Sequence, residues 1–138
     1  MRIVAFAPAL IASEDEGGGV SAAGFPMTNC YVDALPAEIT ISVVIAVVGL
    51  SGDEDEYDPV RYLIVKGPDG ERASAMQFAW HWDDDPESPV KFRVFLQELP
   101  ISVGSEGTYS LGLYTHLEGT QPEQTFPLQV SLSPRVRV

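Results

Sequence analysis

Apolar and polar residues alternate with a period of two along most of the chain, a pattern typical of β-strands with one buried face. The clearest segment is 88–98. Its expected inward residues are Val90, Phe92, Val94 and Leu96, and its expected outward residues are Lys91, Arg93, Phe95 and Gln97.

Three other segments alternate in the same way. Segment 72–82 places Met76, Phe78, Trp80 and Trp82 on one face. Segment 108–117 places Tyr109, Leu111, Leu113 and Leu117 inward and Ser110, Gly112, Tyr114 and His116 outward. Segment 125–132 places Phe126, Leu128, Val130 and Leu132 inward.

Segment 38–50 begins by alternating and becomes apolar on both faces from Val43 to Val48, which predicts a central strand covered on both sides. Segment 60–66 is rich in β-forming residues and ends in Gly67-Pro68-Asp69-Gly70, which predicts a hairpin to the next strand. Residues 3–12 have the outline of a short secretion signal, but Pro8 and the single preceding arginine favour a first strand.

Polar breaks that contain Gly or Pro separate these segments, and no window shows a helical stripe. Seven or eight short strands predict an all-β fold, an antiparallel β-sandwich or small barrel, in a single domain that covers residues 1–138. No apolar run is long enough for a membrane span, so no membrane association is expected.

Three short motifs carry a resemblance to a known family. They are Glu106-Gly107-Thr108-Tyr109-Ser110-Leu111, the hairpin segment 63–71, and Ala9-Leu10-Ile11-Ala12-Ser13. With the strand layout, they resemble an uncharacterised family of small immunoglobulin-like β-sandwich proteins from bacteria and their phages. The resemblance implies an immunoglobulin-like fold, in which the Tyr109 hydroxyl bonds back across a corner of the chain, and it implies no activity.

The composition excludes several classes of function. The 138 residues include 20 Asp plus Glu and 8 Lys plus Arg, for a net charge of −12. Direct nucleic-acid binding is not expected, because phosphate contacts need clustered basic residues. Cys30 is the only cysteine, so the chain has no internal disulfide and no multi-thiolate zinc site. A lone cysteine and a poor signal sequence predict a cytoplasmic protein.

Twelve of the 20 acidic residues fall in three runs, 14–16, 53–58 and 83–87, all in expected loops. If residues 20–33 cross the sandwich once, all three runs lie at one end, and both termini lie at the other end with Arg2, Lys66, Arg72, Arg135 and Arg137. If the chain turns at 26–29, the first run moves to the other end, and the second and third runs stay together in either case. The candidate partner-binding residues in these loops are Asp53, Glu54, Asp55, Glu56, Asp58, Asp83, Asp84 and Asp85.

Three interpretations of the acidic loops remain open. In the first, they serve only to keep the domain soluble, since charge runs are usually solvated. In the second, they bind calcium through Asp53, Asp55, Asp58, Asp83 and Asp85, although the spacing matches no EF-hand loop. In the third, they dock a protein partner with a basic surface, drawn in by their electric field.

Phe95, Tyr114 and Arg93 form a second candidate surface, because all three are expected on outward faces and exposed aromatics beside arginine are typical of interface cores. The alternative is that a second sheet or a loop covers the two aromatic side chains.

No catalytic site is expected. The chain has no Gly-x-Ser-x-Gly elbow, its two histidines, His81 and His116, are expected on outward faces, and Cys30 has no histidine nearby in sequence. The sequence therefore predicts a non-enzymatic protein-binding module, monomeric or homodimeric, without a cofactor or a resident metal. The alternatives are a structural or virion-associated module that self-associates and a calcium-binding sandwich.

Overall fold

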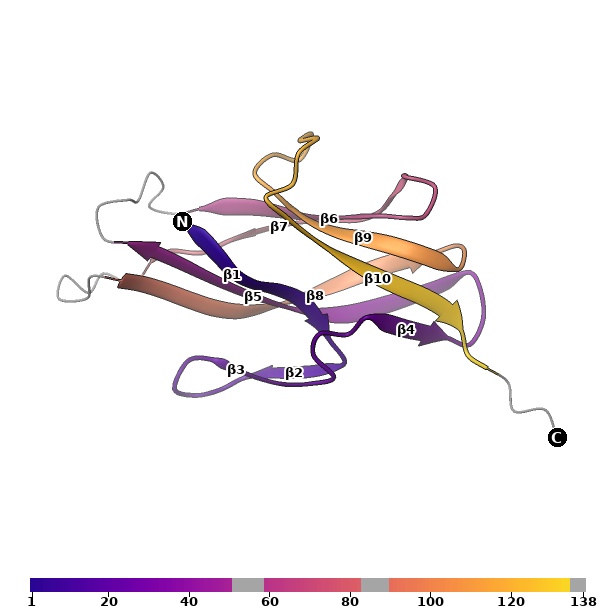
Figure 1. Ribbon diagram of the computed structural model, residues 1–138, viewed down its shortest axis with the longest axis horizontal. Coiled ribbons are helices and arrows are strands. Elements are labelled where there is room, and N and C mark those ends of the chain that lie inside the picture. Colours follow the sequence, from indigo (N-terminus) through magenta and orange to yellow (C-terminus); the bar gives the residue numbers. More distant parts are fainter. Residues whose placement is uncertain (51–58, 83–89, 135–138) are drawn as a thin grey trace.

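Two β-sheets and a separate hairpin form the protein (Figure 1). The computed structural model describes residues 1–50, 59–82 and 90–134. The three-stranded sheet has the order β1 (Arg2–Ala9), β5 (Ala37–Leu50), β8 (Val90–Val103). The five-stranded sheet has the order β4 (Asn29–Val32), β10 (Gln124–Leu132), β9 (Gly107–Tyr114), β6 (Val60–Lys66), β7 (Arg72–Ala79). The hairpin pairs β2 (Ile11–Glu14) with β3 (Val20–Ala23).

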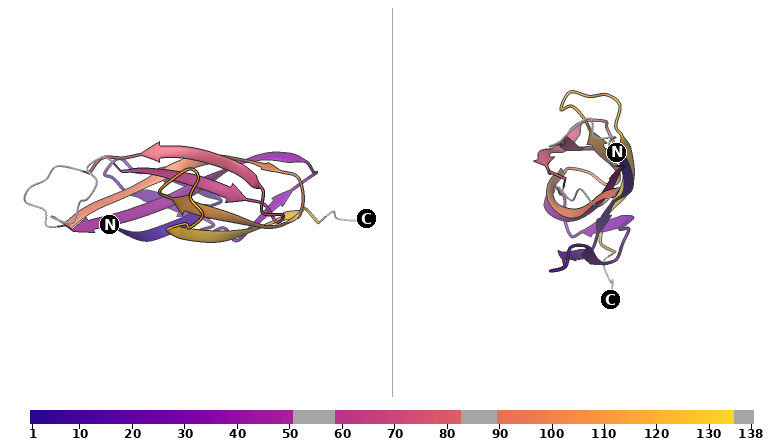
Figure 2. Two further views of the ribbon diagram at one scale, coloured as in Figure 1. Left: turned by 90° about the horizontal axis from the view of Figure 1, so that it is seen from above. Right: turned by 90° about the vertical axis from the view of Figure 1, so that its left-hand side faces the viewer.

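The all-β prediction is confirmed, and side chains from the two sheets form a common core. The end-on view shows the two sheets packed against each other (Figure 2). Ten strands occur in the described residues, more than the expected seven or eight, because two expected crossings each divide in two. The expected first strand is interrupted at Leu10, so this part of the chain forms β1 and β2. The Leu10 amide donates to the Gly24 carbonyl at 3.2 Å. Residues 20–33 divide into β3 and β4, so the expectation of a single crossing there is wrong. Gly24 has a φ of 62°, a conformation that glycine adopts without steric cost.

Strand β5 is buried on both faces, as its sequence predicts. Val43, Ile45 and Val47 are fully buried in the core between the sheets, and Val44 and Ala46 are buried on the opposite face. Strand β2 contacts β5 and β8, and Figure 1 shows the β2–β3 hairpin on the other side of β5 and β8 from β6 and β7. The hairpin therefore helps to cover the second face of the central strand.

The tryptophans belong to the core, as the alternation of segment 72–82 predicts. Phe78, Trp80 and Trp82 are all at most 6% exposed. The Phe78 and Trp80 rings stack with centroids 5.8 Å apart, and Trp82 meets Trp80 edge to face at 6.0 Å. Such pairs stabilise the core beyond the burial of their area.

Strand β8 differs from the prediction in phase and in length. Phe95 is buried whereas Phe92 is 53% exposed, so the inward and outward faces of segment 88–98 are exchanged. The strand also continues to Val103, beyond the predicted segment 88–98, because Leu99, Ile101 and Val103 extend the inward row. A continuous register with β5 along its whole length decides the phase.

The free edge of β8 explains the proline within it. Residues of an antiparallel strand direct their amides alternately toward and away from the partner strand. The Leu96 amide donates to the Glu14 carboxylate rather than to β5. The even-numbered residues of β8, including Pro100, therefore direct their backbone N and C=O groups away from β5. A proline at such a position removes no bond from the ladder.

The hydrogen bond expected for Tyr109 is present. Its hydroxyl donates to the Ser105 carbonyl at 2.8 Å, across the corner at which β9 begins. Gly107 lies in this corner with a φ of 144°, and a side chain there would collide with Pro68 of the β6–β7 turn. The predicted hairpin between β6 and β7 is also confirmed, with the Gly67 amide bonded to the Glu71 carbonyl at 2.8 Å.

Across the described ranges, no helix has the length and apolar character needed to traverse a membrane.

Tyr109→Phe should lower the free energy of unfolding by about 1 kcal/mol, because a mostly buried hydrogen bond to a backbone carbonyl is lost. The control is Tyr31→Phe, since Tyr31 is 57% exposed and its change should be close to neutral. Urea denaturation followed by tryptophan fluorescence measures both. Equal effects of the two substitutions would contradict a stabilising role for the corner.

Candidate functional site

The strand ends that flank both acidic segments meet at one end of the molecule, here called the loop end (Figure 1). Leu50 pairs with Val90 where β5 ends and β8 begins. The Trp80 amide donates to the Pro59 carbonyl at 3.2 Å, next to the pair Val60–Ala79. The chain thus enters and leaves segments 51–58 and 83–89 at the same end. The candidates Asp53, Glu54, Asp55, Glu56, Asp58, Asp83, Asp84 and Asp85 themselves lie outside the described residues.

The first acidic run lies elsewhere. It occupies the turn of the β2–β3 hairpin, and the Glu14 carboxylate accepts a hydrogen bond from the Leu96 amide at 3.3 Å, halfway along β8. The prediction that all three runs share one end is therefore wrong for 14–16, because the hairpin folds back beside the sheet.

The expected position of the N-terminus is also wrong. Arg2 pairs with Val48, so β1 begins at the loop end and β10 finishes at the opposite end (Figure 1). Lys66 and Arg72 pair at that opposite end, as expected. Arg135 and Arg137 lie outside the described residues.

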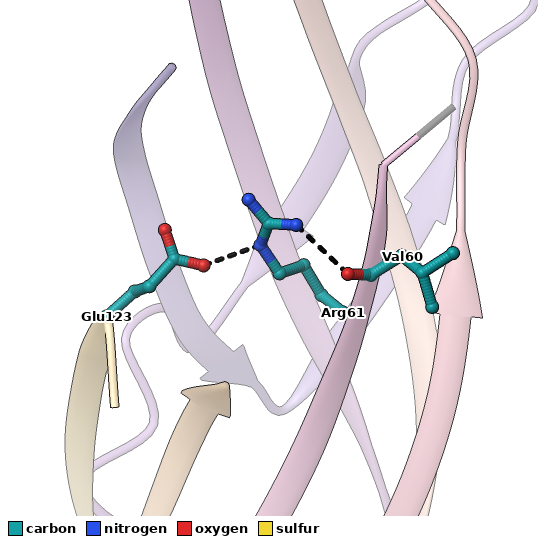
Figure 3. Close-up of polar contacts among 3 residues, drawn as sticks. All are labelled: Val60, Arg61 and Glu123. Atoms are coloured by element: carbon teal, nitrogen blue, oxygen red, sulfur yellow. Dashed lines mark hydrogen bonds and ion pairs between the residues drawn. The ribbon is translucent and has the colours of Figure 1, made fainter. Parts of the chain in front are cut away.

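A buried arginine holds the β9–β10 connection to the core near the loop end (Figure 3). Arg61 is 5% exposed, and its Nε donates to Glu123 Oε1 at 2.5 Å. Its Nη1 donates to the Val60 carbonyl at 2.9 Å, and its guanidinium lies 5.9 Å from the centre of the Trp80 ring. A buried charge needs such partners because desolvation is costly. The arginine therefore has a structural role at this end of the core.

Tyr114 is covered, so the prediction of an exposed aromatic is wrong. The residue is 4% exposed, its ring lies against Gly112, where a side chain would overlap it, and Lys66 Nζ is 5.8 Å from the ring centre. The connection that follows β9 folds back over this face, with Gly119 against the ring and the Leu117 carbonyl accepting a hydrogen bond from Arg72. The alternative considered from the sequence, a covering loop, is what the structure has.

The prediction that Phe95 lies on the surface is also wrong, for a different reason. It is 7% exposed and packs between the sheets, with its ring centre 5.6 Å from Phe78 and 5.5 Å from Trp80. Arg93 is partly buried beside the β2–β3 turn. The three residues predicted to share a face thus lie in three environments, and a partner of the folded protein would reach little of either aromatic side chain.

A groove separates the hairpin turn from β8. Its volume is about 550 Å³, and its walls are formed by Glu14, Asp15 and the Gly17–Gly19 turn on one side and by residues 92–95 of β8 on the other. Sequence reasoning missed this groove. The acid–glycine run 14–19 does predict a turn, but nothing in it indicates which strand the turn will lie against.

The remaining titratable residues that were candidates for a site do not form one in the described part of the chain. His81 and His116 are both exposed. In the described ranges, no three His, Cys, Asp or Glu residues are grouped so that they could hold a metal ion. The calcium ligands considered from the sequence belong to segments 51–58 and 83–89 and so lie outside those ranges.

Comparison of the chain with protein-family models, curated proteins and solved structures finds no match. The class that the structure defines is an all-β, sandwich-like protein.

Glu123→Ala should lower the free energy of unfolding by about 1.5–3 kcal/mol, because the buried Arg61 guanidinium loses a charged acceptor. The matched control is Glu118→Ala in the same connection, where the side chain is exposed. Thermal and urea denaturation of both variants provide the measurement. A loss for Glu118→Ala as large as for Glu123→Ala would show that the ion pair does not stabilise the fold.

Cys30 should react slowly with iodoacetamide at pH 8. Burial raises the pKa of its thiol, and the thiolate is the reacting species. The expected rate is below that of glutathione at the same pH, and unfolding in urea should bring the two rates together. A native rate equal to that of glutathione would contradict the effect of burial.

Proposed function

We propose that this protein is a non-enzymatic, immunoglobulin-like binding module that docks a protein partner at its acidic loop end. The observation that carries the proposal is the placement of the flanking strand ends: Leu50, Pro59, Trp80 and Val90 all belong to the loop end. Segments 51–58 and 83–89, which join these strand ends, contribute nine of the chain's 20 acidic residues. Binding loops carried by a rigid scaffold are a common arrangement for recognition.

The strand connectivity supports an immunoglobulin-like classification. In the strand letters of that fold, β1, β5 and β8 correspond to A, B and E, and β6, β7, β9 and β10 correspond to C, C′, F and G. The sheets then read A-B-E and G-F-C-C′, with the short β4 added parallel to β10. The Tyr109 hydrogen bond occupies the corner before strand F, where this fold often has a tyrosine.

Electrostatics favours a basic protein as the partner. A chain with a net charge of −12 repels nucleic acid and anionic surfaces and attracts positive patches. Such attraction acts mainly on the rate of encounter and weakens as salt shortens the Debye length, which is about 10 Å at 0.1 M salt. A partner bound at the loop end should therefore bind in a salt-dependent manner.

Self-association is the second candidate, and the edges of the sheets favour it. Within the described residues, β7 and β8 each pair on one side only, and open edges can pair with another copy. Light scattering over a wide concentration range tests this function. A mass that stays at that of the monomer would exclude it, and a salt-insensitive dimer would favour it over docking.

The docking function predicts a charge-dependent interaction. In the loop variant, Asp53, Asp55, Asp83 and Asp85 are each replaced by Asn. In the control, the same number of charges is removed at the opposite end by Asp33→Asn, Glu38→Gln, Asp69→Asn and Glu71→Gln. The wild-type protein is used to capture a partner from lysate, and the partner is identified by mass spectrometry. The control should recover the same amount of this partner, and the loop variant should recover at least about tenfold less.

Two results would contradict this function. One is equal recovery of the partner by both variants, which would make the loop charges a solubility device. The other is a rise in melting temperature with millimolar calcium that the loop variant lacks, since a ligand that binds the native state must stabilise it. That rise would assign the acidic residues to cation binding.

A further inference from the structure

The free edge of β8 is protected along part of its length and open along the rest. In the described residues, β8 pairs only with β5, and the residues that face away from β5 are those of the same parity as Leu96. The Leu96 amide is occupied by the Glu14 carboxylate, and Pro100 has no amide hydrogen to offer. Toward the loop end, Phe92 and Val94 direct their backbone groups to the same edge.

The open stretch coincides with the groove beside the β2–β3 turn. Residues 92–95 form one wall of its roughly 550 Å³ volume, and the turn forms the other. The turn residues Gly17, Gly18 and Gly19 have open space where side chains would be, so an incoming backbone could approach closely. A volume of this size lies within the usual range of ligand pockets, about 300–1,000 Å³.

We propose that this groove binds an extended, basic segment of another protein, which adds as a short strand to the β8 edge at Phe92 and Val94. Main-chain hydrogen bonds supply affinity in this mode of recognition, and the side chains that alternate along the added strand supply specificity. The proposal concerns a different surface from the acidic loop end and does not depend on it.

Charge and exposure identify the kind of segment. The turn wall carries Glu14 and Asp15, within an acidic run that also includes Glu16. Phe92 is 53% exposed on the β8 wall. A strand that alternates a cationic and an aliphatic side chain places the cation near the turn carboxylates and the aliphatic group against Phe92. Because Arg93 also lines the groove, the cationic side chain belongs on the turn side.

The hairpin sets the length of the added strand. Glu14 closes the edge at Leu96, so an incoming strand can pair with Phe92 and Val94 but not beyond them toward Pro100. Through this contact the same hairpin that lies beside the sheet also limits edge-to-edge pairing along the rest of β8.

The test uses a defined probe, the acetylated and amidated hexapeptide Lys-Val-Lys-Val-Lys-Val. Binding is followed by NMR of the ¹⁵N-labelled full chain. At saturating peptide, hydrogen exchange of the Phe92 and Val94 amides should slow at least tenfold, because both amides become hydrogen-bonded. The same peptide N-methylated at every internal amide keeps the charge and loses the strand hydrogen bonds, and should bind at least tenfold more weakly. The Glu-Val-Glu-Val-Glu-Val peptide should not bind.

Four outcomes overturn the proposal. The first three are no binding of the basic peptide at millimolar concentration, equal binding of the N-methylated peptide, and binding without protection of the Phe92 and Val94 amides. The fourth is protection of these amides that rises with protein concentration in the absence of peptide, since a second copy would then occupy the edge. All of these comparisons use the wild-type protein, so they hold even if a variant fails to fold.

A pair of variants adds a structural test. Val94→Pro removes an amide that faces away from β5, as the native Pro100 does, and should weaken peptide binding at least tenfold. The control, Glu98→Pro, alters the same edge outside the groove and should leave binding unchanged. The loop variant with Asp53, Asp55, Asp83 and Asp85 neutralised should retain peptide protection of Phe92 and Val94. That result separates failure of this proposal from failure of docking at the loop end.

Discussion

The burial of β5 on both faces is the constraint on which the rest of the structure depends. A strand whose central residues are apolar on both sides needs a cover on each. The five-stranded sheet covers Val43, Ile45 and Val47, and the opposite face, with Val44 and Ala46, needs a second layer. The β2–β3 hairpin contributes that layer by folding back beside the sheet, and in doing so it brings an acidic turn against β8. The groove next to β8 is thus a consequence of how the central strand is buried.

Basic side chains are used to hold the β9–β10 connection in place. Arg61 binds Glu123 on the core side, Arg72 binds the Leu117 carbonyl on the outer face, and Lys66 lies over the Tyr114 ring. The chain has only 8 Lys and Arg residues, so these contacts engage a substantial part of its positive charge. Arg61 and Glu123 neutralise each other, whereas Arg72 is exposed and keeps its charge at the surface.

The sequence predicted where the strands occur more reliably than it predicted which face of each strand is buried. Phe78, Trp80 and Trp82 alternate with small or polar residues, so their inward face could be identified without the structure. In β8, Phe92 and Phe95 point to opposite faces of the strand. The local alternation predicts that Phe92 is buried, whereas the structure buries Phe95. Only the register with β5, extended to Val103, determines that Phe95 enters the core. The same difficulty affected the candidate site, because Phe95 and Tyr114 were expected on the surface from alternation alone.

The sequence by itself determined the all-β character, the two-sided burial of the central strand and the β6–β7 hairpin, because each depends on neighbouring residues and on turn chemistry. The Tyr109 corner was expected only through the resemblance of its motif to immunoglobulin-like proteins. The tertiary structure alone decided where the turn at 14–19 lies, which face of β8 is buried and what covers Tyr114. Each of these depends on contacts between residues far apart in the chain: Glu14 with Leu96, Phe95 with Phe78, and Arg72 with Leu117. Such contacts form only when whole strands pair and pack, and a local pattern of apolar and polar residues carries no record of them.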